Sequence, residues 1–141
     1  MNLRQKYAHM KAAQVYSELS YCRRKKVGCV VVKDHKVISI GYNGTPPGED
    51  NCCEDNYNKT LPHVIHAEDN VLRKLKGNEA EGASLFVTTA PCIECAKKII
   101  KAKIKDVYYL DIYRSSDGID HLIDNNINCS KLTPPVTMYQ D

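Results

Sequence analysis

Two short motifs constrain the fold of this chain more than any other feature: His-Ala-Glu at 66–68 and Pro-Cys-Ile-Glu-Cys at 91–95. They supply one imidazole, two thiolates and one free carboxylate, from His66, Cys92, Cys95 and Glu68. Imidazole and thiolate are preferred zinc ligands, and three protein ligands leave tetrahedral zinc one open position, as in catalytic sites. The fold must therefore bring both motifs to one metal ion.

The cysteine motif is predicted to open a helix over 92–102. Cys92 and Cys95 are three residues apart, so both sulfurs lie on one side of that helix, and Pro91 suits its start. Unpaired N–H groups and the helix dipole at such a start favour thiolate over thiol. Glu94, between the cysteines, is on the wrong side of its helix to share in general acid–base catalysis.

The histidine motif is predicted to open a second helix, over 66–76. Residues two apart point away from each other inside a helix, but in the first turn both side chains lean toward the N-terminal end. His66 and Glu68 can therefore converge on a pocket off that end. Glu68 can there move protons to and from a zinc-activated water.

Each motif alone also has an ordinary interpretation. A lone His-x-Glu is usually a solvated or capping pair, and Cys-x-x-Cys at a helix start also fits a thioredoxin-like redox pair or half of a structural zinc site. Glu68 favours catalysis, because a non-catalytic zinc or redox module has no use for an unligated carboxylate there. Zinc content after purification distinguishes the redox pair.

Alternating apolar strands and helical segments predict one α/β domain over 1–141, and 43% hydrophobic content suffices for a core. A hairpin turns at Asp34-His35, and a loop rich in Gly, Pro, Asn and Asp spans 43–62. The mixed sheet should carry helices on both faces. Strands are expected at 28–33, 36–42, 84–89, 106–110 and near 129–132, and helices ending near Leu19 and over 66–76, 92–102 and 117–126.

Further segments add to the two motifs, at 26–31, 41–48, 51–53, 82–90 and 104–109. With them the chain resembles the deoxycytidylate (dCMP) deaminases of the zinc-dependent cytidine deaminase superfamily, especially the compact bacteriophage-type enzymes. The zinc motifs match the superfamily signature, and Gly-Tyr-Asn-Gly-Thr-Pro-Pro-Gly at 41–48 matches the dCMP branch. The similarity runs from Cys22 to about Ile127 and implies a three-layer α/β/α fold with a mixed five-stranded sheet.

The resemblance implies hydrolytic deamination of dCMP to dUMP, which supplies the thymidylate pathway. His66, Cys92 and Cys95 would hold the catalytic zinc, and Glu68 would be the catalytic residue. The family commonly forms homohexamers that dCTP activates and dTTP inhibits, and Mg²⁺ can accompany the effector nucleotide. The matching effector loop consists of Asn43, Gly44, Thr45, Pro46 and Gly48.

The residues expected to contact the substrate are Lys26, Asn43, Ala67 and Tyr113. Asn43 directly follows a predicted strand, and the matching family residue contacts the sugar, although Asn-Gly is also an ordinary turn. Lys26 ends the basic run at 23–26 and would pair with the 5′-phosphate; such runs are otherwise solvated surface. Tyr113 would stack or contact the phosphate.

A second, structural zinc is a further expectation. Cys22, Cys52 and His63 fall close to positions that bind one in some relatives, with Cys53 as a candidate fourth ligand. Those relatives place a carboxylate two residues before the catalytic histidine, where this chain has Val64. The alternative is that these cysteines are buried or free thiols.

Composition bears on location. The sequence contains no apolar run long enough to span a bilayer, and residues 1–16 lack the apolar segment of a signal peptide. The seven cysteines suit metal ligands and buried thiols better than a secreted disulfide framework. We therefore expect a cytoplasmic protein, located in the host cytoplasm if a phage encodes it.

A nucleic-acid deaminase of the tRNA or editing type is the main alternative within the superfamily. Such an enzyme shares the zinc core but needs a basic, aromatic surface for a flipped base. The net charge of only +3 argues against it.

Overall fold

The central sheet is built from short apolar runs rich in β-branched residues, which suit the pleated surface of a strand. The computed structural model describes residues 1–137, which form a five-stranded sheet in the order β2-β1-β3-β4-β5. β1 pairs antiparallel with β2 and β3, whereas β3, β4 and β5 run parallel, so the predicted mixed sheet is confirmed. The strands are β1 (Gly28–Lys33), β2 (Lys36–Tyr42), β3 (Ser84–Thr89), β4 (Asp106–Asp111) and β5 (Asn128–Lys131).

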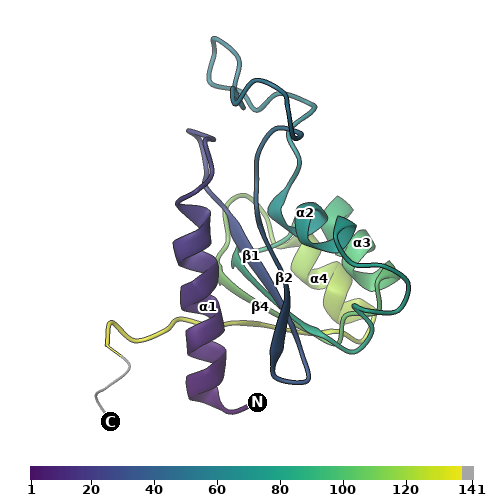
Figure 1. Ribbon diagram of the computed structural model, residues 1–141. Helices are drawn as coiled ribbons and strands as arrows, with labels where there is room; N and C mark the ends of the chain where they lie inside the picture. The colour runs from purple at the N-terminus through teal and green to yellow at the C-terminus, as the bar shows by residue number, and fades with distance from the viewer. Residues whose placement is uncertain (138–141) are drawn as a thin grey trace.

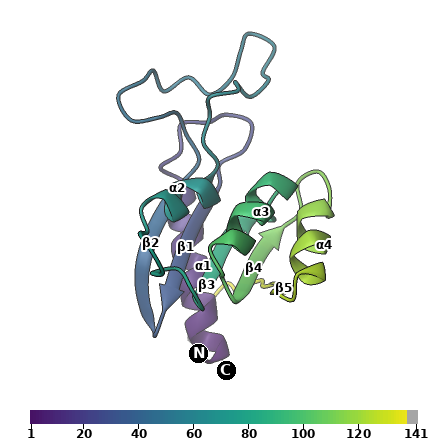
Figure 2. The ribbon, with the colours of Figure 1, turned by 90° about the vertical axis from the view of Figure 1, so that its right-hand side faces the viewer.

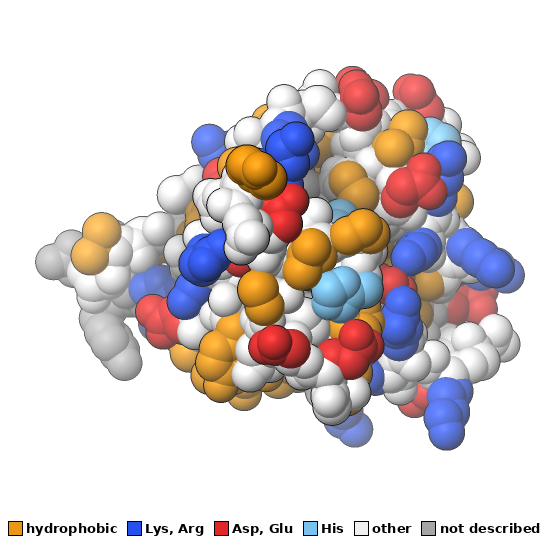
Figure 3. Space-filling view, turned by 90° about the horizontal axis from the view of Figure 1, so that it is seen from above, with side chains coloured by type: hydrophobic (Ala, Val, Ile, Leu, Met, Phe, Trp, Pro, Cys, Tyr) orange, Lys and Arg blue, Asp and Glu red, His pale blue; other side chains and the backbone are white. Residues whose placement is uncertain are grey.

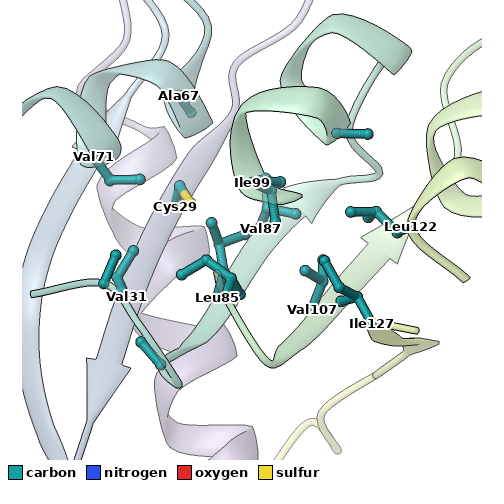
Figure 4. Packing of buried hydrophobic residues seen from close by; sticks show 14 residues of the cluster. Cys29, Val31, Ala67, Val71, Leu85, Val87, Ile99, Val107, Leu122 and Ile127 are labelled. Atoms are coloured by element: carbon teal, nitrogen blue, oxygen red, sulfur yellow. The ribbon is translucent and has the colours of Figure 1, made fainter. Parts of the chain in front are cut away.

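Helices cover both faces of this sheet, which gives three layers (Figures 1 and 2). The helices are α1 (Leu3–Ser17), α2 (Ala67–Arg73), α3 (Ile93–Lys101) and α4 (Asp117–Asp124). α1 packs on one face through an apolar cluster that includes Met10 and Phe86. α2, α3 and α4 pack on the opposite face over a second cluster, which includes Val87, Ile99 and Val107 (Figure 4).

Most boundaries agree with the sequence prediction, and α2 shows the largest difference. The helix expected over 66–76 ends at Arg73, and Gly77 and Gly82 adopt positive φ angles of 56° and 78° in the turns that follow. Glycine favours such turn conformations because it lacks a Cβ. The predicted hairpin turn is confirmed: Asp34 and His35 have φ angles of 51° and 64°, as a type I′ turn requires.

Tight packing holds the cysteine motif in place. Gly118, in the first turn of α4, lies so close to the motif that an added Cβ would be 1.9 Å from the carbonyl oxygen of Pro91. Only glycine permits that approach. α4 therefore packs directly against Pro91 and Cys92, in the segment that connects β3 to α3.

Residues 43–65, called the long loop below, extend from the end of the molecule at which α2 and α3 begin (Figures 1 and 2). Within 1–137, no helix has the length and apolar character needed to cross a membrane.

Candidate zinc centre and active site

The candidate metal ligands sit where two helices begin. His66 is the residue that precedes the first turn of α2, and Cys92 occupies the same position in α3, with Cys95 one turn further on. The Cys95 N–H donates to Cys92 Sγ over 3.5 Å, which fixes the cysteine side chain at the helix start. The extended backbone at Cys92 follows directly from β3 through Ala90 and Pro91. The predicted helix-start positions are thus observed.

Three side chains converge with the spacing that tetrahedral zinc needs. His66 Nδ1 lies 3.6 Å from Cys92 Sγ and 3.4 Å from Cys95 Sγ. Zinc bonds of about 2.0 Å to nitrogen and 2.3 Å to sulfur place tetrahedral ligands about 3.6 Å apart. All three ligand atoms lie within 4.8 Å of one another. The residues therefore fit one zinc ion and leave its fourth position free for water or substrate.

Glu68 lies beside this triad in a buried environment. It belongs to the first turn of α2 and is 4% exposed. Burial raises the pKa of its carboxyl to about 7. Hydrogen bonding with Cys95 and His66 lowers the pKa of Cys92 to about 3, so its thiolate is available to a metal. A carboxyl that titrates near neutral pH suits proton transfer in both directions.

A cavity of about 810 Å³ runs from these residues to a basic region. Its lining includes His66, Glu68 and Cys92 of the zinc motifs together with the basic region of Arg24, Lys25, Tyr113 and Arg114. Residues 57–60 of the long loop also line it. Figure 3 views the molecule from the end that carries this loop. On the described part of this face, Lys and Arg side chains are interspersed with acidic and apolar side chains. They form no continuous basic surface of the kind that binding a polynucleotide would require.

Three cationic side chains lie close to Tyr113, namely those of Arg24, Lys25 and Arg114. These four residues are called the basic cluster below. Arg24 Nη2 donates to Tyr113 Oη over 3.2 Å. Lys25 Nζ lies 5.6 Å and the Arg114 guanidinium 5.2 Å from the centre of that ring. Lys25 Nζ also pairs with Asp111 Oδ2 at 3.2 Å. The cluster presents three cations to the cavity and so favours an anionic group at this end.

The structure favours Lys25 over the predicted Lys26 as a cavity residue. Lys26 is exposed, and the basic run contributes only Arg24 and Lys25 to the described cavity lining. Val27 packs against the core, and side chains alternate along extended chain, so Lys25 shares its side and Lys26 faces away. That alternation could have identified Lys25. No sequence pattern indicated Arg114, which lies in the irregular segment after β4.

Asn43, Ala67 and Tyr113, the other residues expected to contact the substrate, line the cavity. The Asn43 amide is largely used within the protein, because its Oδ1 accepts from the Val27 N–H at 2.9 Å and its Nδ2 donates to Lys25 O at 2.8 Å. Asn43 therefore holds the backbone of the basic run beside the cavity. The other residues of the expected effector loop lie outside the described cavity lining: Gly44, Thr45, Pro46 and Gly48.

The cysteines near the long loop pair differently from the sequence expectation. Cys22 and Cys53 are buried and joined by a disulfide, with Glu54 beside them. Cys52 and His63 are exposed and lie outside this group. Consecutive side chains in extended chain point to opposite sides, so Cys53 turns inward and Cys52 outward. The expected set of Cys22, Cys52 and His63 is corrected accordingly, and not all of these cysteines are thiols.

Glu54 anchors this region. Its carboxylate is buried and accepts from the N–H groups of Arg23 and Arg24 over 2.9 and 3.1 Å. It thereby ties the long loop to the basic run. Sequence reasoning missed Glu54, although it directly follows the cysteine pair.

Comparisons with known proteins agree with this geometry. A family model described as "Cytidine and deoxycytidylate deaminase zinc-binding region" matches residues 3–111. The chain is 35% identical over 118 residues to deoxycytidylate deaminase of Saccharomyces cerevisiae, covering 77% of this chain and 38% of that protein. It is 36% identical over 111 residues to deoxycytidylate deaminase of Mycobacterium phage D29, covering 69% and 87%.

A solved structure extends the agreement to the fold. The structure of dCMP deaminase from cyanophage S-TIM5 in complex with dCMP and dUMP matches with a TM-score of 0.89 and 44% identity, covering 93% of this chain and 98% of that one. The predicted cytidine deaminase-like fold is confirmed. The chain belongs to the cytidine and deoxycytidylate deaminase zinc-binding family.

Proposed function

We propose that this protein is a zinc-dependent hydrolase that converts dCMP and water to dUMP and ammonia. The observation that carries the proposal is one cavity whose lining combines His66 and Cys92 of the candidate zinc triad, buried Glu68 and the basic cluster. A nucleoside monophosphate has a matching distribution of chemistry, with an amino-bearing base at one end and a phosphate at the other. The nucleotides bound to the cyanophage enzyme support the same choice.

His66, Cys92 and Cys95 would hold the zinc ion, which supplies Lewis-acid activation of water. Glu68 would take a proton from the attacking water, whose oxygen bonds to the amino-bearing carbon, and deliver that proton to the adjacent ring nitrogen. It would then move the second proton of the same water to the amino group, which leaves as ammonia when the carbon–nitrogen bond breaks. Because Glu68 is buried and its pKa is raised to about 7, it can accept and donate protons in one cycle near neutral pH.

The basic cluster is proposed to bind the 5′-phosphate. Lys25, Arg24 and Arg114 supply cationic donors, and Tyr113 holds them around its ring. A charge-assisted contact of this kind distinguishes a nucleotide from a nucleoside, because only the nucleotide carries the anion. Asn43 and Ala67 also line the cavity and are proposed to contact the substrate.

We also propose a homohexamer that dCTP activates and dTTP inhibits, with Mg²⁺ accompanying the effector. The effector loop would act through Asn43, Gly44, Thr45, Pro46 and Gly48. The resemblance of this loop to that of the family motivates the proposal. One contact supports it: Gly44 is hydrogen bonded to Ile65, which directly precedes His66. A structural change caused by effector binding at Gly44 would thus be transmitted to the zinc centre through few intervening residues.

The proposed second zinc would take a revised set of ligands. Cys22, Cys53 and Glu54 place their ligand atoms within 4.8 Å of one another, and all three are buried. Two thiolates and a carboxylate are suitable zinc ligands, provided that the disulfide between Cys22 and Cys53 is reduced. Zinc and the disulfide are thus mutually exclusive ways to fasten the long loop.

One assay tests the proposed activity directly. Ammonia release should be measured for zinc-loaded protein with dCMP, CMP, deoxycytidine and dCTP as substrates. We expect dCMP to react with the highest kcat/KM and deoxycytidine to react poorly for lack of a phosphate. Absence of ammonia from every substrate would contradict the proposal, and equal use of dCMP and deoxycytidine would contradict the role of the basic cluster.

A further inference from the structure

Glu54 is a buried charge at the edge of the active-site cavity. It contributes to the cavity lining, yet its side chain is only 2% exposed. The neighbouring stretches of the long loop, 47–52 and 56–60, are exposed. A carboxylate loses favourable hydration when it is buried, so burial requires donors that replace the lost water. The donors around Glu54 therefore indicate what this residue does.

The donors that satisfy the Glu54 carboxylate are mainly backbone groups of the basic run. Glu54 Oε2 accepts from the N–H groups of Arg23 and Arg24 over 2.9 and 3.1 Å. The Arg23 side chain contributes less, because its Nε lies 3.5 Å from Oε1 and the side chain is 64% exposed. One carboxylate oxygen thus fixes the orientation of the two successive peptide groups that lead to Arg24.

The path of the basic run depends on such side-chain contacts. Residues 23–27 follow an irregular path, and two side chains of the long loop bind to their backbone. Asn43 holds the second half of the segment, because its amide bonds with Lys25 O and the Val27 N–H. Glu54 holds the first half. Each half of the segment is therefore anchored by its own residue of the long loop.

The first half of this segment delivers Arg24 to the basic cluster. Arg24 Nη2 donates to Tyr113 Oη over 3.2 Å, in a bond that is exposed to solvent. An exposed hydrogen bond contributes little by itself, and a long side chain loses rotamer freedom when it is held in one place. The direction of the Arg24 side chain therefore depends on the backbone that Glu54 orients.

We propose that Glu54 is a positioning residue for recognition of the 5′-phosphate: it directs Arg24 toward the phosphate through the backbone, without touching the substrate. The proposal rests on the proposed function and deepens it, because it names a residue that orients the basic cluster. The phosphate does not react, so a weaker phosphate contact removes binding that the ground state and the transition state share. Loss of Glu54 should therefore raise the KM for dCMP and leave kcat nearly unchanged.

The test measures kcat and KM for dCMP and deoxycytidine with Glu54→Ala and Glu54→Gln. All proteins carry one zinc per chain and an intact disulfide between Cys22 and Cys53, so that Glu54 does not serve as a metal ligand. Glu54→Ala should raise the KM for dCMP roughly 10- to 100-fold, as for a displaced binding group, and change that for deoxycytidine much less. Glu54→Gln retains a neutral oxygen that accepts N–H groups, so it should fall between Glu54→Ala and wild type.

Asp55 provides the matched control. Its Oδ1 also accepts two backbone N–H groups, but these belong to Tyr57 and Lys59, within the long loop itself. Asp55→Ala therefore removes the same kind of contact without releasing the basic run. Any loss of activity should be equal for dCMP and deoxycytidine. If Asp55→Ala lowered the preference for dCMP as much as Glu54→Ala, the fold of the loop, and not the direction of Arg24, would be responsible.

A double-mutant cycle tests whether Glu54 acts through Arg24. In an Arg24→Ala background, Glu54→Gln should change the preference for dCMP over deoxycytidine by roughly 2-fold or less, because the side chain that Glu54 directs is absent. Full additivity of the two changes would overturn the proposal. An unchanged KM for dCMP in both Glu54 variants, or an equal loss for both substrates, would also overturn it.

Binding measurements separate this proposal from the proposed function. Calorimetry with dCMP on zinc-loaded Glu68→Gln, with and without Glu54→Gln, measures phosphate recognition without turnover. A wild-type enzyme that binds dCMP but does not deaminate it contradicts the proposed function, while weaker binding after Glu54→Gln still supports the positioning role. Equal affinity, or no binding of dCMP to either protein, overturns that role. If Glu54→Ala fails to fold, Glu54→Gln and the double-mutant cycle decide it.

Discussion

Gly44 and Ile65 exchange two backbone hydrogen bonds: the Gly44 N–H donates to Ile65 O over 3.1 Å, and the Ile65 N–H donates to Gly44 O over 2.8 Å. This isolated antiparallel bridge closes the base of the long loop. Asn43 lies on one side of the bridge and the zinc ligand His66 on the other. The bridge therefore connects Asn43 in the cavity wall to His66 in the metal centre at the point where the loop begins and ends.

The first prediction concerns proton transfer. Glu68→Gln preserves the shape of the buried side chain but cannot accept a proton, so turnover should fall roughly 100- to 10,000-fold. Zinc content and dCMP binding should remain close to wild type. Glu94→Gln is the matched control, because Glu94 has a 73% exposed side chain paired with Lys97, and its activity should be unchanged. Substantial ammonia release by Glu68→Gln would rule out the proton-transfer role.

The second prediction separates the two adjacent lysines. Lys25→Ala should lower kcat/KM for dCMP roughly 10- to 100-fold and that for deoxycytidine much less, because only dCMP carries the phosphate. Lys26→Ala should leave both values near wild type, since Lys26 is exposed and outside the described cavity lining. If Lys26→Ala were the more damaging change, our orientation of the basic run would be wrong.

The sequence indicated the zinc centre and the sheet, but not which lysine of the basic run lines the cavity. The convergence of His66, Cys92 and Cys95 was predictable because zinc chemistry restricts both ligand type and spacing. The order of apolar strands and helical segments indicated the mixed sheet. The resemblance to the family indicated Lys26, whereas the alternation of side chains along β1 and the extended chain before it favours Lys25. Extending it through Val27 places Lys25 inward.

Other features depend on contacts that a local pattern does not encode. The pairing of Cys22 with Cys53 joins residues 31 apart and is set by the path of the long loop. Arg114 reaches the cavity from an irregular segment that has no periodicity to interpret.

The third prediction tests how the long loop is fastened. Cys53→Ser should lower the free energy of unfolding by about 3 kcal/mol, because it removes either the disulfide or a zinc ligand. Cys52→Ser is a matched neighbour on the exposed side and should have little effect. Zinc and thiol titration of the wild type distinguishes the two states. We expect one zinc per chain with the disulfide, and two after reduction and zinc loading. Equal stability of the two variants would contradict the pairing of Cys22 with Cys53.

The last prediction concerns regulation through the bridge between Gly44 and Ile65. Without effector, the plot of velocity against dCMP concentration should be sigmoidal. dCTP should make the plot hyperbolic, and dTTP should counteract the activation by dCTP. Allosteric coupling is typically about 1 to 3 kcal/mol, or roughly 5- to 150-fold in affinity. Gly44→Pro removes the N–H that donates to Ile65. It should reduce the fold-change in dCMP affinity that dCTP causes, while zinc is retained. Pro47→Ala, an exposed change in the same loop, should keep full activation. Hyperbolic curves that neither triphosphate alters would show that the loop serves the structure of the site without regulating it.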